Sequence, residues 1–247
     1  MVCDTVVYHP SITRLINYLD STGGREKILR LLQYLARFLA VQQSSKLAKS
    51  LQSQFTLVRK FLRFLKPLNH LQAASKLYDN KLNSDLIIRY ANIIKNLAMG
   101  GYLFLDQINL LRILKVIDSN NFTGTVVPRW TNWFWFFGLV ASQVVNIRTI
   151  RKSQCKIVAL LREKELEMMS NNENEIDKEK LIEDDKSLKA AYMQRYSSTR
   201  KLIWDSLDSF IVLNNLNYLS NEDGYIALSG VATSLLGIQD LWRGTKI

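Results

Sequence analysis

Few side chains in this sequence have the chemistry that catalysis needs. His9 and His70 are the only histidines, and the two cysteines have neither metal nor disulfide spacing. Asp205 and Asp208 lie three residues apart, so on one helix face their carboxylates would be placed for acid–base work. The sequence supplies no further groups that would assist these carboxylates in acid–base catalysis. It also contains no phosphate-binding loop, metal-ligand cluster or nucleophile motif. We therefore expect a protein that is not an enzyme and that has no cofactor or metal.

Basic side chains at helical spacing offer a different chemistry, the binding of anions. Residues 55–66 read FTLVRKFLRFLK, and at 3.6 residues per turn the apolar and basic side chains separate onto opposite faces. The apolar members are Phe55, Val58, Phe61, Leu62 and Leu65, and the basic members are Arg59, Lys60, Arg63 and Lys66. We expect the basic face to meet water and anionic head groups while the apolar face enters the acyl chains. These residues form the predicted membrane-binding site.

Two other interpretations of this stretch have to be weighed. The formal net charge of +11 suits any polyanion, nucleic acid included. A helix that reads a duplex presents polar side chains to the base edges, whereas this one carries bulky apolar groups that a duplex would leave unused. We therefore expect an anionic phospholipid membrane as partner and no nucleic acid. The same apolar spacing also describes a helix packed in a bundle, and bundle packing does not exclude membrane insertion.

The elements that position these side chains are predicted to be helices, because prolines are few and strand-like alternation is scarce. We expect an all-α, membrane-associated helical bundle with amphipathic N-terminal helices and one or two hydrophobic membrane helices. Residues 1–83 form the basic amphipathic region. Its helices are expected at about 11–20, 25–41, 45–66 and 68–81, with Ser44 or Ser45 as a cap and Pro67 as a break.

The next region, residues 84–162, is hydrophobic. A buried or interfacial helix pair is expected over 84–117, with a hinge at Gly100 and Gly101. The alternative is a membrane-spanning segment whose charges lie inside a bundle. Residues 130–147 carry no charge and have tryptophans at one end, so they are a candidate membrane span, with a buried helix as the alternative. Residues 163–187 are rich in acidic side chains and are predicted to be a flexible linker, with a helix that has no face to bury as the alternative.

The C-terminal helical region, residues 188–247, contains a second candidate membrane helix at 225–242. Small side chains recur there at four-residue spacing, in two parallel rows. They are Ser229, Gly230, Thr233, Ser234 and Gly237. Small residues at this spacing let helix backbones approach closely, so these residues are the predicted helix-packing site.

Four segments closely resemble the fungal peroxin-eleven family, whose members are peroxisomal membrane proteins. They are residues 25–39, 58–68, 210–216 and 228–240, and the most specific block is KFLRFLKP at 60–67. The likeness covers nearly the whole chain and fails mainly in the acidic linker. The family's membrane-remodelling helix maps onto about 56–78.

The resemblance implies a protein of the peroxisomal membrane that inserts amphipathic helices and self-associates as a homo-oligomer. Such a protein elongates the membrane and promotes peroxisome division and proliferation, with a dynamin-type GTPase and its adaptors as fission partners. The alternative function is a pore-forming channel for small metabolites. A channel would require polar side chains such as Gln143, Asn146, Thr233 and Gln239 to converge on one path.

Overall fold

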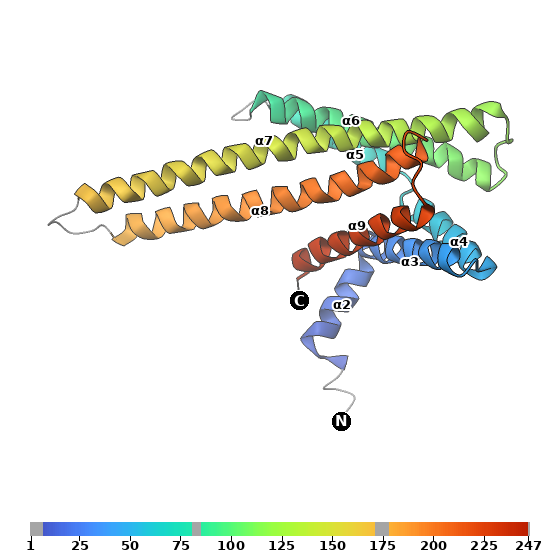
Figure 1. Ribbon diagram of the computed structural model, residues 1–247, viewed down its shortest axis with the longest axis horizontal. Coiled ribbons are helices and arrows are strands. Elements are labelled where there is room, and N and C mark those ends of the chain that lie inside the picture. The colour runs from blue at the N-terminus through green and yellow to red at the C-terminus, as the bar shows by residue number, and fades with distance from the viewer. Residues whose placement is uncertain (1–6, 81–84, 171–177, 247) are drawn as a thin grey trace.

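The computed structural model describes residues 7–80, 85–170 and 178–246, and within these ranges the chain forms helices and turns but no strand (Figure 1). The expected all-α class is confirmed. In chain order the elements are α2 (Pro10–Asp20), α3 (Thr22–Gln42), α4 (Lys46–Leu62), α5 (Pro67–Asp79), α6 (Leu86–Ile113), the π-helical turn η1 (Phe122–Val126), α7 (Val127–Ser170), α8 (Lys178–Asn215) and α9 (Asp223–Gly244).

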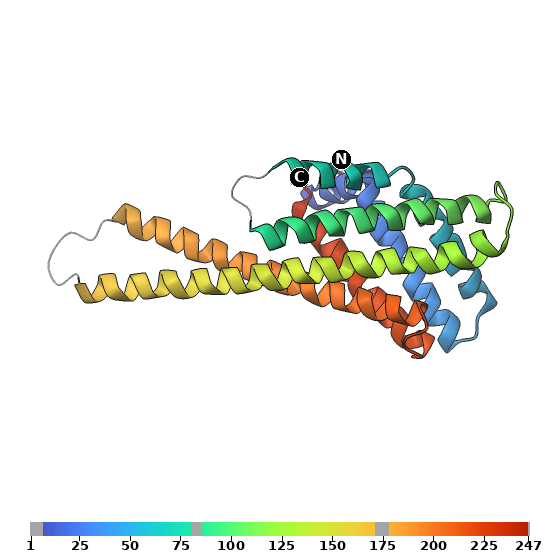
Figure 2. The same cartoon turned by 90° about the horizontal axis from the view of Figure 1, so that it is seen from above.

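The helices pack as two connected groups. The helix α7 lies between α6 and α8, and α5 packs on α6. The helix α3 lies between α4 and α9, α2 packs on α3, and α9 also contacts α8. Beyond these groups α7 and α8 continue together as a long hairpin that projects away from the other helices (Figures 1 and 2). We call the part of the molecule around α3, α4, α6 and α9 the body.

Local sequence explains where several helices begin and end. Ser21 and Ser45 cap α3 and α4, because each hydroxyl oxygen accepts a hydrogen bond from the backbone N–H three residues later, at 2.9 and 3.3 Å. The helix α4 ends at Leu62, and Leu65 then adopts a φ of 59° before Pro67 opens α5. We call residues 61–71, which include this turn, the α4–α5 elbow.

Two expectations about helix continuity differ from the structure. The segment from Leu86 to Ile113 is one helix without a hinge at its glycines. A Cβ atom on Gly101 would lie 2.7 Å from the ring of Phe134, so this glycine gives α7 room to approach α6. The acidic stretch is helical wherever it is described, which agrees with the alternative and not with a flexible linker, because residues 163–170 complete α7 and residues 178–187 begin α8.

The two candidate membrane helices lie within α7 and α9. Across residues 7–80, 85–170 and 178–246, no helix carries an apolar stretch that meets the length and hydropathy needed to cross a bilayer. The expectation of one or two hydrophobic membrane helices is therefore not confirmed.

Candidate functional site

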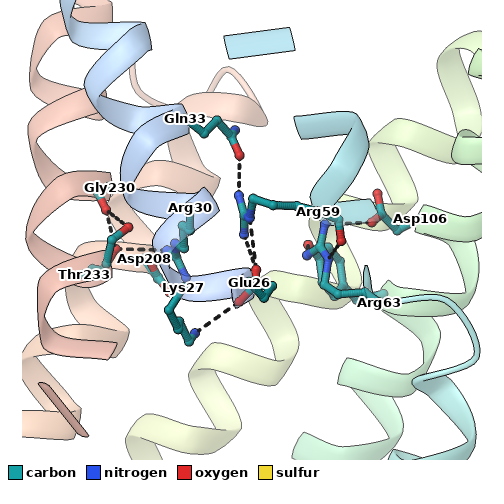
Figure 3. Close-up of polar contacts among 12 residues, drawn as sticks. Glu26, Lys27, Arg30, Gln33, Arg59, Arg63, Asp106, Asp208, Gly230 and Thr233 are labelled. Carbon is teal, nitrogen blue, oxygen red and sulfur yellow. Dashed lines mark hydrogen bonds and ion pairs between the residues drawn. The ribbon is translucent and has the colours of Figure 1, made fainter. Parts of the chain in front are cut away.

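The basic face of α4 lies inside the body (Figure 3). Arg59 donates to Oε1 of Glu26 on α3 at 2.7 and 3.0 Å, and also to Gln33. Lys60 pairs with Asp106 on α6. The side chains of Arg59 and Lys60 are buried, so the expectation that this face meets water is wrong. The carboxylates that neutralise Arg59 and Lys60 lie 33 and 46 residues away in the sequence. They reach α4 only through tertiary packing, which the local sequence pattern does not contain.

Arg63 extends the same network toward α6. Its guanidinium donates to Asp106 at 3.0 Å and to the hydroxyl of Tyr102 at 2.8 Å. Asp106 therefore accepts from two cations of the α4 region. Lys66, the last basic residue of the predicted site, is half-buried and forms no ion pair within the residues described.

A second ion pair joins α3 to the C-terminal helices. Arg30 donates to Asp208 on α8 at 2.5 Å and to Thr233 on α9 at 2.9 Å, and the indole of Trp204 also donates to Asp208. Asp205 instead accepts from Asn146 on α7 at 2.9 Å. The two carboxylates considered for acid–base work thus have partners on different helices, Asp208 on α3 and Asp205 on α7.

The electrostatics of this interior follow from burial and from close opposite charges. Burial alone would raise the pKa of Glu26, but the neighbouring Arg59 and Lys27 lower that pKa to about 2. For Lys27, burial and the nearby Arg30 lower the pKa to about 8. At neutral pH the interior thus holds Glu26 as a carboxylate, and Lys27 stays mostly protonated although its pKa is lowered.

The outer side of the α4–α5 elbow is apolar. Phe61 is 49% exposed, Phe64 52% and Leu65 57%, and Leu68 and Leu71 are exposed beside them. Phe55 and Leu62 are half-buried, whereas Val58 is exposed. Phe64 was absent from the predicted site because that prediction extended the helix to Lys66. The left-handed conformation of Leu65 interrupts the helical wheel there.

The small residues of α9 lie against α3 and α8. A Cβ atom on Gly230 would lie 2.2 Å from the ring of Tyr34, and one on Gly237 would lie 2.9 Å from Trp204. Thr233 and Ser234 are fully buried, and Ser229 is half-buried. The structure therefore places Gly230 against α3 and Gly237 against α8, with Thr233 and Ser234 buried between them in the sequence.

A cavity of about 560 Å³ opens between the charged side chains, and we call it the charged cavity. Eight basic and five carboxylate side chains line it, together with Tyr34, Tyr102, Trp135 and Trp204. Within the described part of the chain, no group of histidine, cysteine and acidic side chains is arranged to hold a metal ion. The chemistry that the cavity offers is therefore charge recognition.

Comparisons with family models and with individual proteins agree on one family. A family model described as peroxisomal biogenesis factor 11 (PEX11) matches residues 12–242. The chain is 57% identical to peroxisomal membrane protein PMP27 of Saccharomyces cerevisiae, over 99% of this chain and 100% of the relative. It is 34% identical to peroxisomal membrane protein PMP30B of Candida boidinii, over the whole of both chains. No solved structure matches significantly.

These matches confirm the resemblance to the fungal peroxin-eleven family. Peroxisomal biogenesis factor 11 of Schizosaccharomyces pombe is 26% identical over 96% of this chain and 97% of the relative. The family description names a biogenesis factor and no catalysed reaction. The chain belongs to the PEX11 family and is a protein of the peroxisomal membrane.

Proposed function

We propose that this protein curves and elongates the peroxisomal membrane by inserting the α4–α5 elbow into one leaflet, and that it thereby promotes peroxisome division. One observation carries the proposal. The elbow exposes Phe61, Phe64 and Leu65 on its outer side while the cations behind it are paired inside the body. An exposed cluster of bulky apolar side chains of this kind marks an interaction surface.

The ion pairs behind the elbow make it a firm wedge. Arg59, Lys60 and Arg63 tie α4 to α3 and α6, so insertion need not unfold the body. Each bulky side chain moved out of water contributes about 1.5–3 kcal/mol before losses. Volume added to one leaflet expands it relative to the other, which favours positive curvature.

Because the predicted cations are buried or half-buried, other basic side chains have to attract anionic phospholipid. Lys46, Lys49 and Lys76 are exposed on α4 and α5. Each basic side chain near an anionic surface contributes about 1 kcal/mol. Binding of one copy is therefore reversible, and shaping an organelle requires self-association of many copies. Elongated membrane is then the substrate for a dynamin-type fission machinery.

Tubulation of liposomes that contain anionic phospholipid tests the wedge. We expect the triple variant F61S/F64S/L65S to lose tubulation, as seen by electron microscopy, while its helix content stays unchanged. The matched control is V158S/L161S, which removes exposed apolar side chains from the α7–α8 hairpin. Equal tubulation by the elbow variant and the wild type would refute the proposal.

Charge reversal within the basic set is a poorer test of membrane binding. Substitution of Arg59 or Arg63 by glutamate would bring a carboxylate against Glu26 or Asp106 inside the body. The resulting loss of folding would be indistinguishable from a loss of lipid contact.

The charged cavity favours a second candidate, a channel for small metabolites. The four polar side chains named for that function do not line the cavity. Gln143 bonds to Ser209, Asn146 to Asp205 and Thr233 to Arg30, and Gln239 is exposed. Conductance across a planar bilayer, with an ion selectivity that changes in the cavity variant K201E, would support a channel. If the wild-type protein gives no conductance at concentrations that tubulate liposomes, a channel function is excluded.

A further inference from the structure

The charged cavity has more positive than negative side chains, and most of its carboxylates are already neutralised. Glu26 is paired with Arg59, Asp106 with Lys60 and Arg63, and Asp208 with Arg30. Asp240, at the edge of the cavity, is paired with Arg200. The surplus positive charge therefore lies on the remaining cations of the lining.

Three of those cations form no ion pair within the described residues; one is Lys66 in the α4–α5 elbow, and the other two come from separate helices. Lys95 lies on α6 and Lys201 on α8, and within the described residues neither forms an ion pair. Arg30 lines the same cavity and is 8% exposed, and its Nε has no hydrogen-bond partner among the described atoms. A buried donor without a partner is costly, and its presence on a cavity wall indicates a missing acceptor.

The surroundings of Lys95 support the same conclusion. Burial and the charge of Lys201 lower the pKa of Lys95, whereas Asp205 acts in the opposite direction. The carboxylate of Asp205 is itself occupied by Asn146, and burial raises its pKa. Two ammonium groups that repel one another across a cavity are stabilised when an anion lies between them.

We propose that the charged cavity binds the phosphomonoester group of a small molecule or of a lipid head group, with Lys95, Lys201 and the Nε of Arg30 as donors. Lysine ammonium groups bind phosphate as point charges, and a phosphomonoester dianion matches the surplus of positive charge. The volume of about 560 Å³ lies in the range of small-molecule sites. The rings of Trp135 and Trp204 provide apolar contact for the organic part.

Tryptophan fluorescence of the full chain in neutral detergent measures this binding, because Trp135 and Trp204 line the cavity. The two probes are 2-glycerophosphate in solution and phosphatidic acid in mixed micelles of phosphatidylcholine and the same neutral detergent. We expect a saturable change with at least one probe. In the double variant K95Q/K201Q we expect affinity to fall by about tenfold or more, as for lost charge-assisted hydrogen bonds. The matched control is K156Q/K189Q, two exposed lysines of the α7–α8 hairpin outside the cavity, and it should bind like the wild type.

Each outcome has a definite meaning. Binding of 2-glycerophosphate alone supports a soluble ligand, binding of phosphatidic acid alone supports a lipid head group, and binding of both supports recognition of the shared phosphate. Neither lysine of the double variant forms an ion pair within residues 7–80, 85–170 and 178–246, so its helix content should equal that of the wild type.

Three results would overturn the proposal. They are saturation by neither probe at millimolar concentration, equal affinity in K95Q/K201Q and the wild type, or the same response to chloride at equal ionic strength. The tubulation assay is independent of these measurements, because no residue of the α4–α5 elbow variant supplies a proposed phosphate donor.

Discussion

The body and the far part of the α7–α8 hairpin arrange the same kinds of side chain in opposite ways. In the body, Arg59, Lys60 and Asp106 are buried while Phe61 and its neighbours are exposed. In the hairpin, Ser153, Ile157 and Ala191 are buried between the two helices. There Arg151, Lys156 and Arg162 face outward, with exposed apolar residues such as Val158 between them.

The difference shows that a charged residue has a different energetic role in each region. A charge on the hairpin is hydrated, and a partner such as that of Lys164 adds little. A charge in the body has left bulk water and depends on its partner for compensation. Removing one partner of an ion pair should therefore lower the free energy of unfolding much more in the body than in the hairpin.

The largest effect is expected from D106N. This change leaves Lys60 and Arg63 without their shared carboxylate inside the body. Breaking a buried pair in this way typically costs about 3–5 kcal/mol. Unfolding followed by circular dichroism in detergent measures the free energy, with the exposed Asp118→Asn as control. A loss as small as that of the control would mean that water reaches the network.

A slightly smaller effect, with a defined pH dependence, is expected from E26Q. The pKa of Glu26 is lowered from 4.5 to about 2, so this carboxylate contributes roughly 3 kcal/mol of stability above pH 4.5. That contribution is lost as pH falls through 2, because the folded state then has to accept a proton. The difference in midpoint temperature between wild type and E26Q should shrink steadily from pH 4.5 to pH 2. A difference that stays constant over this range would contradict the assignment.

Close packing in the body predicts an intermediate effect for G230A. The added Cβ would meet the ring of Tyr34 at 2.2 Å, so α9 and α3 have to move apart. Overpacking of this kind costs about 1–3 kcal/mol. The control G244A has open space at the end of the same helix. Thermal unfolding of both variants checks the contact, which a midpoint for G230A at or above that of G244A would exclude.

The smallest effect is expected from D185N in the hairpin. Asp185 and Lys164 pair at 2.9 Å, but the carboxylate side chain is 65% exposed. Exposed pairs contribute about 0.2–1 kcal/mol, and salt weakens them further. Unfolding at low and high salt measures this contribution. A loss comparable with that of D106N would remove the distinction between the two regions.

Local features of the fold were predictable from the sequence. Pro10–Asp20 was placed correctly, and Ser45 caps α4 as expected, because capping depends on residues within one turn. The grouping of the small residues of α9 on one face depends on local spacing too, while their role as a packing site within a bilayer stays a prediction. Four-residue spacing fixes their mutual positions whatever they pack against.

The direction in which each face points was not predictable. A helical wheel separates Arg59 from Phe61, but it does not say which of them turns inward. That choice depends on Glu26 and Asp106, which reach α4 only through tertiary packing. Phe64 was missed for a different reason, because it lies in the turn that follows the end of α4 at Leu62 and not on a continued helix.

The unbroken course of α7 has a mechanical consequence. It runs without interruption from Val127 in the body to Ser170 in the hairpin. An α-helix rises 1.5 Å per residue, so the part from residue 148 onward is about 34 Å long. A continuous rod of this length acts as a lever. A force on its outer end is therefore transmitted to the helices of the body, because no loop or break in α7 lies between them.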